Sequence, residues 1–295
     1  MAQSRIVVTG AAGEIGRTLR TGLAGRYALL RLSDRTPIDD LRPGESFVRA
    51  ELSDLPALEA ALEGMDAVVH LGGKAQEGTW EEVLQSNVIG TYNLFEAARR
   101  QGVRRVVFAS SHHAVGFYPR GRTIDGDVPP RPDSRYGASK VFGEALGRLY
   151  ADKHGFEVVC LRIGSFQDRP RNVRMLSTWI SPADMVRLVQ ASLEAPDVRF
   201  EVVYGVSANS RSWWRDHAAE RLGYRPQDDA EDYAGEILQS RKAADGPAPE
   251  PAAASMATAD VLRAVTANRA EGPIEGRFQG GPLCGMEFSG DPDLA

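Results

Sequence analysis

A tyrosine and a lysine stand four positions apart in Tyr136-Gly-Ala-Ser-Lys140, at the predicted start of a long helix. Side chains four positions apart lie on the same face of a helix. The ammonium group of Lys140 can stabilise a phenolate, so we expect the pKa of Tyr136 to fall below its reference value of about 10. Ser111, at the end of an earlier predicted strand, adds a hydroxyl group. The sequence therefore predicts a catalytic set, Tyr136, Lys140 and Ser111, that moves a proton near neutral pH.

A glycine-rich turn lies near the N-terminus. The predicted strand Ile6–Thr9 runs into Gly10-Ala-Ala-Gly13-Glu-Ile-Gly16, and a helical pattern follows over Arg17–Leu23. Glycines at this spacing permit a tight turn, a close approach of backbone N–H groups to a pyrophosphate, and close packing of helix on strand. The helix N-terminus adds N–H donors and a favourable dipole. The strand, turn and helix together predict a dinucleotide-binding site at Gly10, Gly13 and Gly16.

An acidic residue, Asp34, ends the second predicted strand. A carboxylate at this position accepts hydrogen bonds from the adenosine ribose and repels a 2′-phosphate, which favours NAD over NADP. The neighbouring Arg35 could instead accommodate a 2′-phosphate, and NAD stays the favoured cofactor. Beside a nicotinamide, Tyr136 would exchange the proton while the cofactor exchanges a hydride.

Other chemistries fit the sequence less well. The segment Gly137-Ala-Ser-Lys-Val141 begins like a hydrolase nucleophile elbow but has valine where the last glycine belongs. His112 and His113 have no further His or Cys at ligand spacing, and Cys160 and Cys284 are far apart, so we predict no metal site. The two histidines are interpreted as polar lining of the pocket or as a simple loop pair.

Two further features are interpreted as structural. His70 follows a buried strand and is expected to be a core histidine. The pair Trp213-Trp214 is expected to pack rather than to stack on a ligand.

Short β-branched runs alternate with amphipathic stretches over the first two-thirds of the chain. The predicted helices include Trp80–Gln101 and Tyr136–His154, and the predicted strands are Ile6–Thr9, Ala28–Ser33, Ser46–Arg49, Ala67–Leu71, Arg105–Ser110 and Glu157–Ile163. The strands are nearly continuous apolar runs, as expected where helices cover both faces of a sheet. This alternation predicts an α/β fold, a Rossmann-type doubly wound parallel sheet with a small C-terminal substrate lobe.

The regular alternation of predicted strands and helices ends after Ile163. We predict a NAD-binding core over 1–163, a substrate-facing lobe over 164–238, a Pro/Ala-rich linker or insertion over 239–272 and a C-terminal tail over 273–295. The lobe is expected to hold a helix over Ala183–Glu194, a strand at Phe200–Tyr204 and a helix near Trp213–Leu222.

Composition sets the broad class. The chain has 295 residues, 42% hydrophobic and 25% charged, as in globular proteins. A formal charge of −5 does not favour binding to nucleic acid or to an anionic membrane. No apolar run approaches a membrane span of about 20 residues, and no signal-peptide pattern precedes the first strand. We expect a cytoplasmic protein with a small-molecule substrate; the sequence leaves its oligomeric state open, a homo-oligomer included.

The chain resembles the extended short-chain dehydrogenase/reductase family. The resemblance rests on the glycine turn, the acid after the second strand, the serine and Tyr-x-x-x-Lys. Within this family, the chain is similar to the members that oxidise free hexuronic acids, most specifically in these stretches: His70-Leu-Gly-Gly73, Asn87-Val-Ile-Gly-Thr-Tyr-Asn-Leu-Phe-Glu-Ala-Ala98, Phe108-Ala-Ser-Ser-His-His113, Val159-Cys-Leu-Arg-Ile-Gly-Ser165 and Arg174-Met-Leu-Ser-Thr-Trp179. The resemblance implies that NAD binds to the three glycines and to a further set of residues. These are Glu14, Ile15, Asp34, Glu51, Leu52, Leu71, Gly72, Gly73, Lys74, Tyr136, Lys140 and Ser165. It implies that the sugar acid contacts Ser111, His112, His113, Tyr136, Ser165 and Arg174.

The reaction implied by the resemblance is the oxidation of glucuronate or galacturonate at C1 to an aldarolactone. Tyr136 would take the C1 hydroxyl proton, the hydride would pass to the nicotinamide, and the fork of Arg174 would bind the carboxylate. The chain departs from the pattern of these members at three positions: His112 replaces asparagine, Ala75 replaces serine and Glu51 replaces aspartate. The first two departures bear on recognition of the sugar, and the third bears on an adenine contact.

Two alternatives stay open at this point. A nucleotide-sugar epimerase or dehydratase would share the same catalytic set, although the part after Ile163 is short for holding a nucleotide diphosphate. A non-catalytic NAD-sensing regulator could use the same fold, but it has no need of the catalytic residues that this chain retains.

Overall fold

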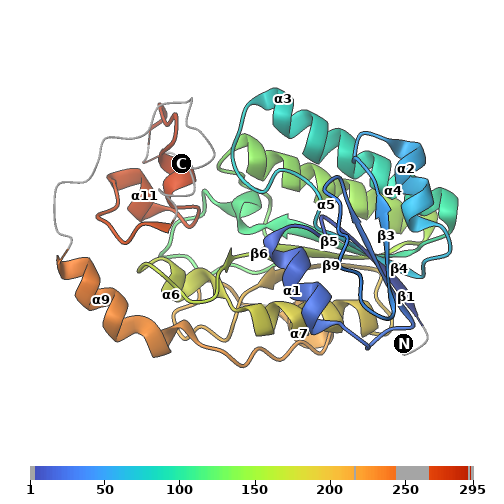
Figure 1. Cartoon of the computed structure of the whole chain (residues 1–295). Helices are drawn as coiled ribbons and strands as arrows, with labels where there is room; N and C mark the ends of the chain where they lie inside the picture. Colours follow the sequence, from blue (N-terminus) through green and yellow to red (C-terminus); the bar gives the residue numbers. More distant parts are fainter. Residues whose placement is uncertain (1–3, 216, 244–265, 292, 294–295) are drawn as a thin grey trace.

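The computed structural model describes residues 4–215, 217–243, 266–291 and 293. At its centre is a parallel sheet of seven strands in the order β3-β2-β1-β4-β5-β6-β9 (Figure 1). The strands are Arg5–Thr9 (β1), Leu29–Asp34 (β2), Glu45–Arg49 (β3), Ala67–His70 (β4), Arg105–Ser111 (β5), Glu157–Ile163 (β6) and Phe200–Gly205 (β9). The strand order reverses between β1 and β4, as in doubly wound dinucleotide-binding folds. The predicted fold class and its strands are confirmed.

Helices cover both faces of the sheet (Figure 1). Along β1, Ile6 and Val8 point into one buried cluster while Val7 points into another, because successive side chains of a strand face opposite sides. The first cluster packs against α1 (Glu14–Gly22) and α7 (Pro182–Glu194). The second packs against three helices: α2 (Leu55–Leu62), α4 (Gly90–Gln101) and α5 (Arg135–His154). Two buried faces explain why the strands are apolar throughout.

The stretch predicted as one helix over Trp80–Gln101 is helical along its length but changes winding. It begins as α3 (Trp80–Val83), continues as a π-helical segment over Leu84–Ile89 and ends as α4. Such π-helical turns are frequent at functional sites. Here the turn brings the buried side chain of Asn87 to the backbone of Lys74, in the loop after β4.

Apart from α7 and β9, the described part of the chain after β6 consists mostly of short elements. These are β7 (Ser165–Phe166), α6 (Met175–Thr178), β8 (Trp179–Ile180), α8 (His217–Arg221), a 3-10 turn over Ala230–Tyr233, α9 (Ala234–Ala243), α11 (Pro273–Arg277) and α12 (Pro282–Gly285). Within the predicted lobe 164–238, β9 is an edge strand of the main sheet and α7 packs on one face of the sheet. The division into four segments stays a prediction, and residues 244–265 of the predicted linker 239–272 lie outside the described residues.

The prediction of a helix near Trp213–Leu222 is wrong at its start. The ring of Trp214 stacks on that of Tyr204 with centroids 4.8 Å apart, and the backbone around Trp214 pairs with Ile124. These contacts with distant residues hold the segment extended, and α8 begins only at His217. The packing role predicted for the two tryptophans agrees with these contacts.

His70 lies in the core, as its position after a buried strand predicts. Its Nδ1 lies 2.7 Å from Oγ1 of Thr9, and burial lowers the pKa of His70 to about 3. The imidazole is therefore neutral at physiological pH.

Among the described residues, no helix is both long and apolar enough to span a bilayer. The cytoplasmic location stays a prediction.

Candidate active site

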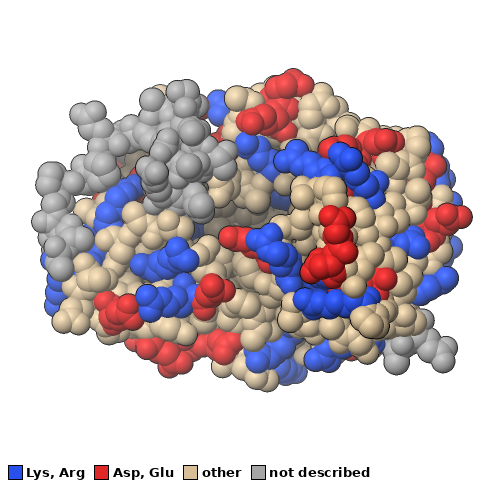
Figure 2. All heavy atoms as spheres, viewed as in Figure 1, with Lys and Arg blue, Asp and Glu red and all other residues tan. Residues whose placement is uncertain are grey.

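A cavity of about 1110 Å³ opens at the carboxyl ends of the sheet strands, where ligands bind in open α/β folds. The surface is hollowed near the middle of the face shown in Figure 2. Every predicted site residue lines this one cavity: Gly10, Gly13, Glu14, Ile15, Gly16, Asp34, Glu51, Leu52, Leu71, Gly72, Gly73, Lys74, Ser111, His112, His113, Tyr136, Lys140, Ser165 and Arg174. The fold thus gathers residues from separate parts of the chain around one space, and their individual roles stay predictions.

The glycine turn after β1 is packed too closely for side chains. Gly10 has φ of +68°, and a Cβ there would lie 2.7 Å from the backbone nitrogen of Gly72. A Cβ on Gly16 would lie 2.5 Å from the carbonyl oxygen of Gly10. The turn therefore directs the N-terminus of α1, with its unpaired N–H groups, at the cavity.

The carboxylate of Asp34 is held in place by the turn beside it. One oxygen accepts from the backbone N–H of Ala12 at 3.0 Å, and the other accepts from that of Thr36 at 2.9 Å. Each carboxylate oxygen has a second lone pair, so Asp34 keeps acceptor capacity for a ribose. Arg35 lines the same part of the cavity.

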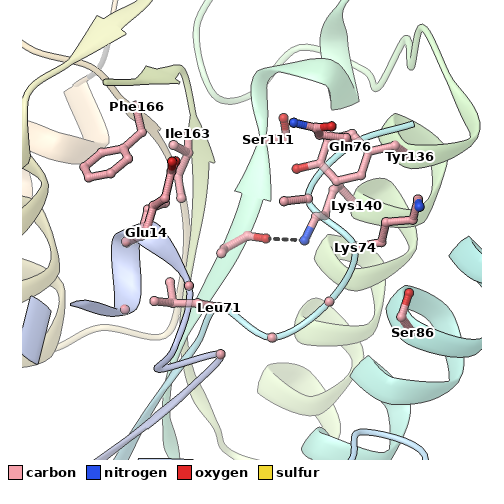
Figure 3. A pocket seen from close by; sticks show the side chains of 18 of the residues that line it. Glu14, Leu71, Lys74, Gln76, Ser86, Ser111, Tyr136, Lys140, Ile163 and Phe166 are labelled. Carbon is pink, nitrogen blue, oxygen red and sulfur yellow. Dashed lines mark hydrogen bonds between the residues drawn. The ribbon is translucent and has the colours of Figure 1, made fainter. Parts of the chain in front are cut away.

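The catalytic candidates come from the end of β5 and the start of α5 (Figure 3). Ser134 caps α5 by accepting from the N–H of Gly137 at 2.9 Å, which fixes the first turn bearing Tyr136. The ammonium group of Lys140 donates to the carbonyl oxygen of Ala109 at 2.9 Å and lies 5.5 Å from the centre of the Tyr136 ring. Tyr136 and Lys140 therefore share one helix face beside the cavity, as predicted from their spacing.

The expected lowering of the Tyr136 pKa is wrong for the protein alone. Burial raises the pKa of Tyr136 to about 12, opposed by a hydrogen bond from Ser111. Burial also lowers the pKa of Lys140 to about 8. Desolvation outweighs the influence of the lysine because both side chains are almost fully covered. In the protein without a ligand, burial therefore favours the neutral tyrosine.

Arg174 is a buried cation that lines the cavity. Only 5% of its surface is exposed, and burial lowers the pKa of its guanidinium to about 10. Its Nε donates to the carbonyl oxygen of Gln279 at 3.1 Å, and its Nη2 donates to His112. Within the described part of the chain, Arg174 forms no salt bridge with a carboxylate. Asp133 and Glu271 act on it only at a distance. Since buried charges are normally paired, a carboxylate of a ligand could supply the direct partner.

His112 contributes to this arrangement as a neutral ring. Its Nδ1 lies 2.9 Å from the carbonyl oxygen of Ile163, which can only accept, so Nδ1 bears the proton. Its Nε2 then accepts from Arg174, and burial lowers the pKa of His112 well below its usual value. Both ring nitrogens are engaged within the protein, so the predicted substrate contact of His112 would require one of these bonds to break.

His113 is oriented by a different partner. Its Nδ1 lies 2.7 Å from the carboxylate of the buried Asp133, which also accepts from the hydroxyl of Ser134. The ring of His113 meets that of Tyr136 edge-on, with centroids 6.0 Å apart. Ser165 pairs its hydroxyl with Thr178 at 2.9 Å. His113 and Ser165 both line the cavity, and their contacts with a substrate stay predictions.

Comparisons with known proteins give the family. Residues 6–198 match the model of the NAD dependent epimerase/dehydratase family. The chain belongs to this family. Family membership confirms NAD as the predicted cofactor.

Relatives at higher similarity include a uronate dehydrogenase from Agrobacterium fabrum, 46% identical, with 84% of this chain and 91% of the relative covered. A uronate dehydrogenase from Pseudomonas putida is 43% identical, and the match covers 83% of this chain and 92% of the relative. A solved structure of a variant uronate dehydrogenase from Agrobacterium tumefaciens, complexed with NAD, is 42% identical with a TM-score of 0.82, covering 96% of this chain and 97% of that one. These similarities confirm that this member of the family is an NAD-dependent oxidoreductase.

Several residues that shape the site of this family member were missed from the sequence. Asn87 holds both backbone polar groups of Lys74, at 2.7 and 3.0 Å, and also contacts Ser139 at 3.0 Å. Gln279 is fully buried, and its carbonyl oxygen holds Arg174. Asn87 stands inside a stretch that carries the family resemblance, so its position was a usable signal. The contact between Arg174 and Gln279 joins residues 105 apart in sequence, and no local pattern predicts it.

Replacing Asp34 with alanine is expected to raise turnover with NADP relative to NAD, since it removes a ribose acceptor and the repulsion of a 2′-phosphate beside Arg35. Competition assays with both cofactors measure the ratio. Asp39→Ala, at an exposed position nearby, is the control and should leave the ratio unchanged. An unchanged ratio in Asp34→Ala would show that another residue sets cofactor choice.

Proposed function

We propose that the protein oxidises free hexuronic acids, glucuronate or galacturonate, at C1 with NAD. The observation that supports this most directly is the buried Arg174, which has no carboxylate partner among the described residues and lies in the same cavity as Tyr136 and Lys140. A guanidinium with free N–H groups matches a carboxylate in geometry and charge. The similarity to uronate dehydrogenases supports the same substrate class.

Each catalytic residue then has a separate task. Tyr136, as the phenolate, takes the proton of the C1 hydroxyl while the C1 hydride leaves, so C1 is oxidised to the lactone carbonyl. When bound, NAD would supply the hydride acceptor and a positive ring charge that favours the phenolate. Lys140 adds a positive charge on the same helix face, and Ser111 hydrogen-bonds to the Tyr136 hydroxyl.

Other residues of the cavity would position the substrate. Arg174 would hold the carboxylate, and its direction is fixed because Gln279 and His112 accept two of its N–H groups. His113 and Ser165 would contact the sugar. The cavity thus separates the group that binds the acid from the group that removes the proton.

Product analysis tests this proposal. With glucuronate and NAD, we expect one NADH for each sugar acid consumed and an aldarolactone as the first product in NMR spectra. An epimerase or dehydratase returns its hydride to the sugar, so it would accumulate no NADH. Consumption of sugar without NADH would therefore refute the proposed reaction, and binding of NAD without turnover would favour a sensor.

Gly281 offers a test of how Arg174 is held. It has φ of +64°, and a Cβ there would lie 2.7 Å from Nε of Arg174. Gly281→Ala should displace the guanidinium and raise KM for the uronate roughly tenfold or more, the scale of one hydrogen bond to a charged group.

The matched control is Gly223→Ala. Gly223 also has positive φ, +79°, but a Cβ there would meet no atom within 4 Å. It should lower the melting temperature with little change in KM. Equal KM values in the two variants would show that Gly281 does not position Arg174.

A further inference from the structure

Gln76 is a polar residue of the cavity wall without an assigned role. It lies in the loop after β4 and lines the cavity together with Ser111 and Tyr136. Its Oε1 is buried and has no hydrogen-bond partner in the described residues. A buried acceptor without a partner is unfavourable by about 1–3 kcal/mol, and such groups in native structures call for a ligand or another partner.

The loop is anchored on both sides of Gln76. Before it, the backbone of Lys74 is held by Asn87 at 2.7 and 3.0 Å. After it, the carboxylate of Glu77 accepts from the backbone N–H of Tyr136 at 2.9 Å and from Arg135 at 3.1 Å. The position of Gln76 is therefore fixed relative to the helix turn that bears Tyr136.

Figure 3 shows Gln76, Ser111 and Tyr136 on the same side of the cavity. The neighbour of Gln76 is Ala75. Alanine offers no polar side-chain atom to a substrate. On the other side of Ala75, the ammonium group of Lys74 already pairs with Glu82 at 3.1 Å. The carboxamide oxygen of Gln76, which has no partner among the described residues, is left to contact a substrate.

We propose that Gln76 is a specificity residue whose Oε1 accepts a hydrogen bond from a ring hydroxyl of the sugar other than that at C1. A hydroxyl suits this acceptor because it is a donor without charge, whereas the carboxylate of the substrate would be repelled by a carbonyl oxygen. This inference rests on the proposed function, since it takes the substrate to be a sugar acid.

The test compares Gln76→Met, which keeps the length of the side chain but removes the carboxamide, with the wild type. Both are assayed on glucuronate and on its 2-, 3- and 4-deoxy analogues. We expect kcat/KM for glucuronate to fall about 2- to 13-fold, the worth of one neutral hydrogen bond. With one of the deoxy analogues the two proteins should be equal, because the partner hydroxyl is already absent. Gln190→Met, on α7 outside the cavity, is the control and should match the wild type on every sugar.

Three results would overturn the role of Gln76. Equal losses on every sugar would mean that it only supports the loop. A weaker Kd for NAD would mean that it contacts the cofactor, and unchanged kinetics would mean that it contacts nothing. If the wild type oxidises neutral aldoses but no uronate, the proposed function fails. The wild type and Gln76→Met are then compared on the accepted aldose and its deoxy analogues, which still decides the role of Gln76.

Discussion

Replacing Tyr136 with phenylalanine is expected to lower kcat by about 10²–10⁴-fold while NAD still binds, because general base catalysis is worth that much. The tyrosine ring packs against Leu283, and the phenylalanine ring keeps this contact. Only the oxygen that takes the C1 hydroxyl proton is lost. Steady-state kinetics with a uronate, together with calorimetric titration of NAD, separate the chemical step from cofactor binding.

Tyr150→Phe is the matched control for this variant. Tyr150 is also a buried tyrosine of α5, but its hydroxyl bonds to Glu96 on α4 at 3.2 Å and lies outside the cavity. Its loss should reduce stability and leave kcat close to that of the wild type. A Tyr136→Phe enzyme with near-normal kcat would show that the proton leaves by another route.

Replacing Arg174 with lysine or alanine is expected to lower kcat/KM for a uronate by roughly ten- to several-hundred-fold. Lysine should not rescue the loss, because a point charge lacks the planar fork that binds a carboxylate through two hydrogen bonds. The lysine variant would also lose at least one of the bonds that Arg174 donates to His112 and Gln279.

Discrimination between sugars is the sharper measurement for Arg174. The wild type should strongly prefer glucuronate over glucose, and Arg174→Ala should abolish this preference by weakening only the reaction of the acid. Arg171→Lys, at an exposed position three residues earlier, should leave the preference intact. Equal losses on glucuronate and glucose would mean that Arg174 is structural and that the carboxylate binds elsewhere, with Arg171 and His113 as the next candidates.

The sheet could be predicted from the sequence because its signals are local. Runs such as Val106-Val-Phe108 are apolar on both faces, and a glycine turn or a strand-end polar residue follows several strands. The carboxyl ends of parallel strands meet at one edge, so residues from separate loops could be expected to share one site. The cavity that gathers all of them confirms this expectation about position.

Features that depend on distant contacts could not be predicted in the same way. The orientation of Arg174 depends on Gln279, far along the chain, and on the tautomer of His112, which the carbonyl oxygen of Ile163 selects. The extended backbone at Trp214 follows from stacking on Tyr204. The raised pKa of Tyr136 follows from burial, which no spacing of residues reveals.

The most direct test of the account is NADH formation by the wild-type protein from NAD with free uronates, neutral aldoses and UDP-sugars, each at equal concentration. Among the described residues the buried Arg174 has no carboxylate ion-pair partner, and it lines the same cavity as Tyr136, so we expect rapid NADH formation with glucuronate or galacturonate. The neutral aldoses and the UDP-sugars should give little. Turnover with UDP-sugars alone would contradict the account, and turnover with neutral aldoses in preference to uronates would remove Arg174 as the group that selects the substrate.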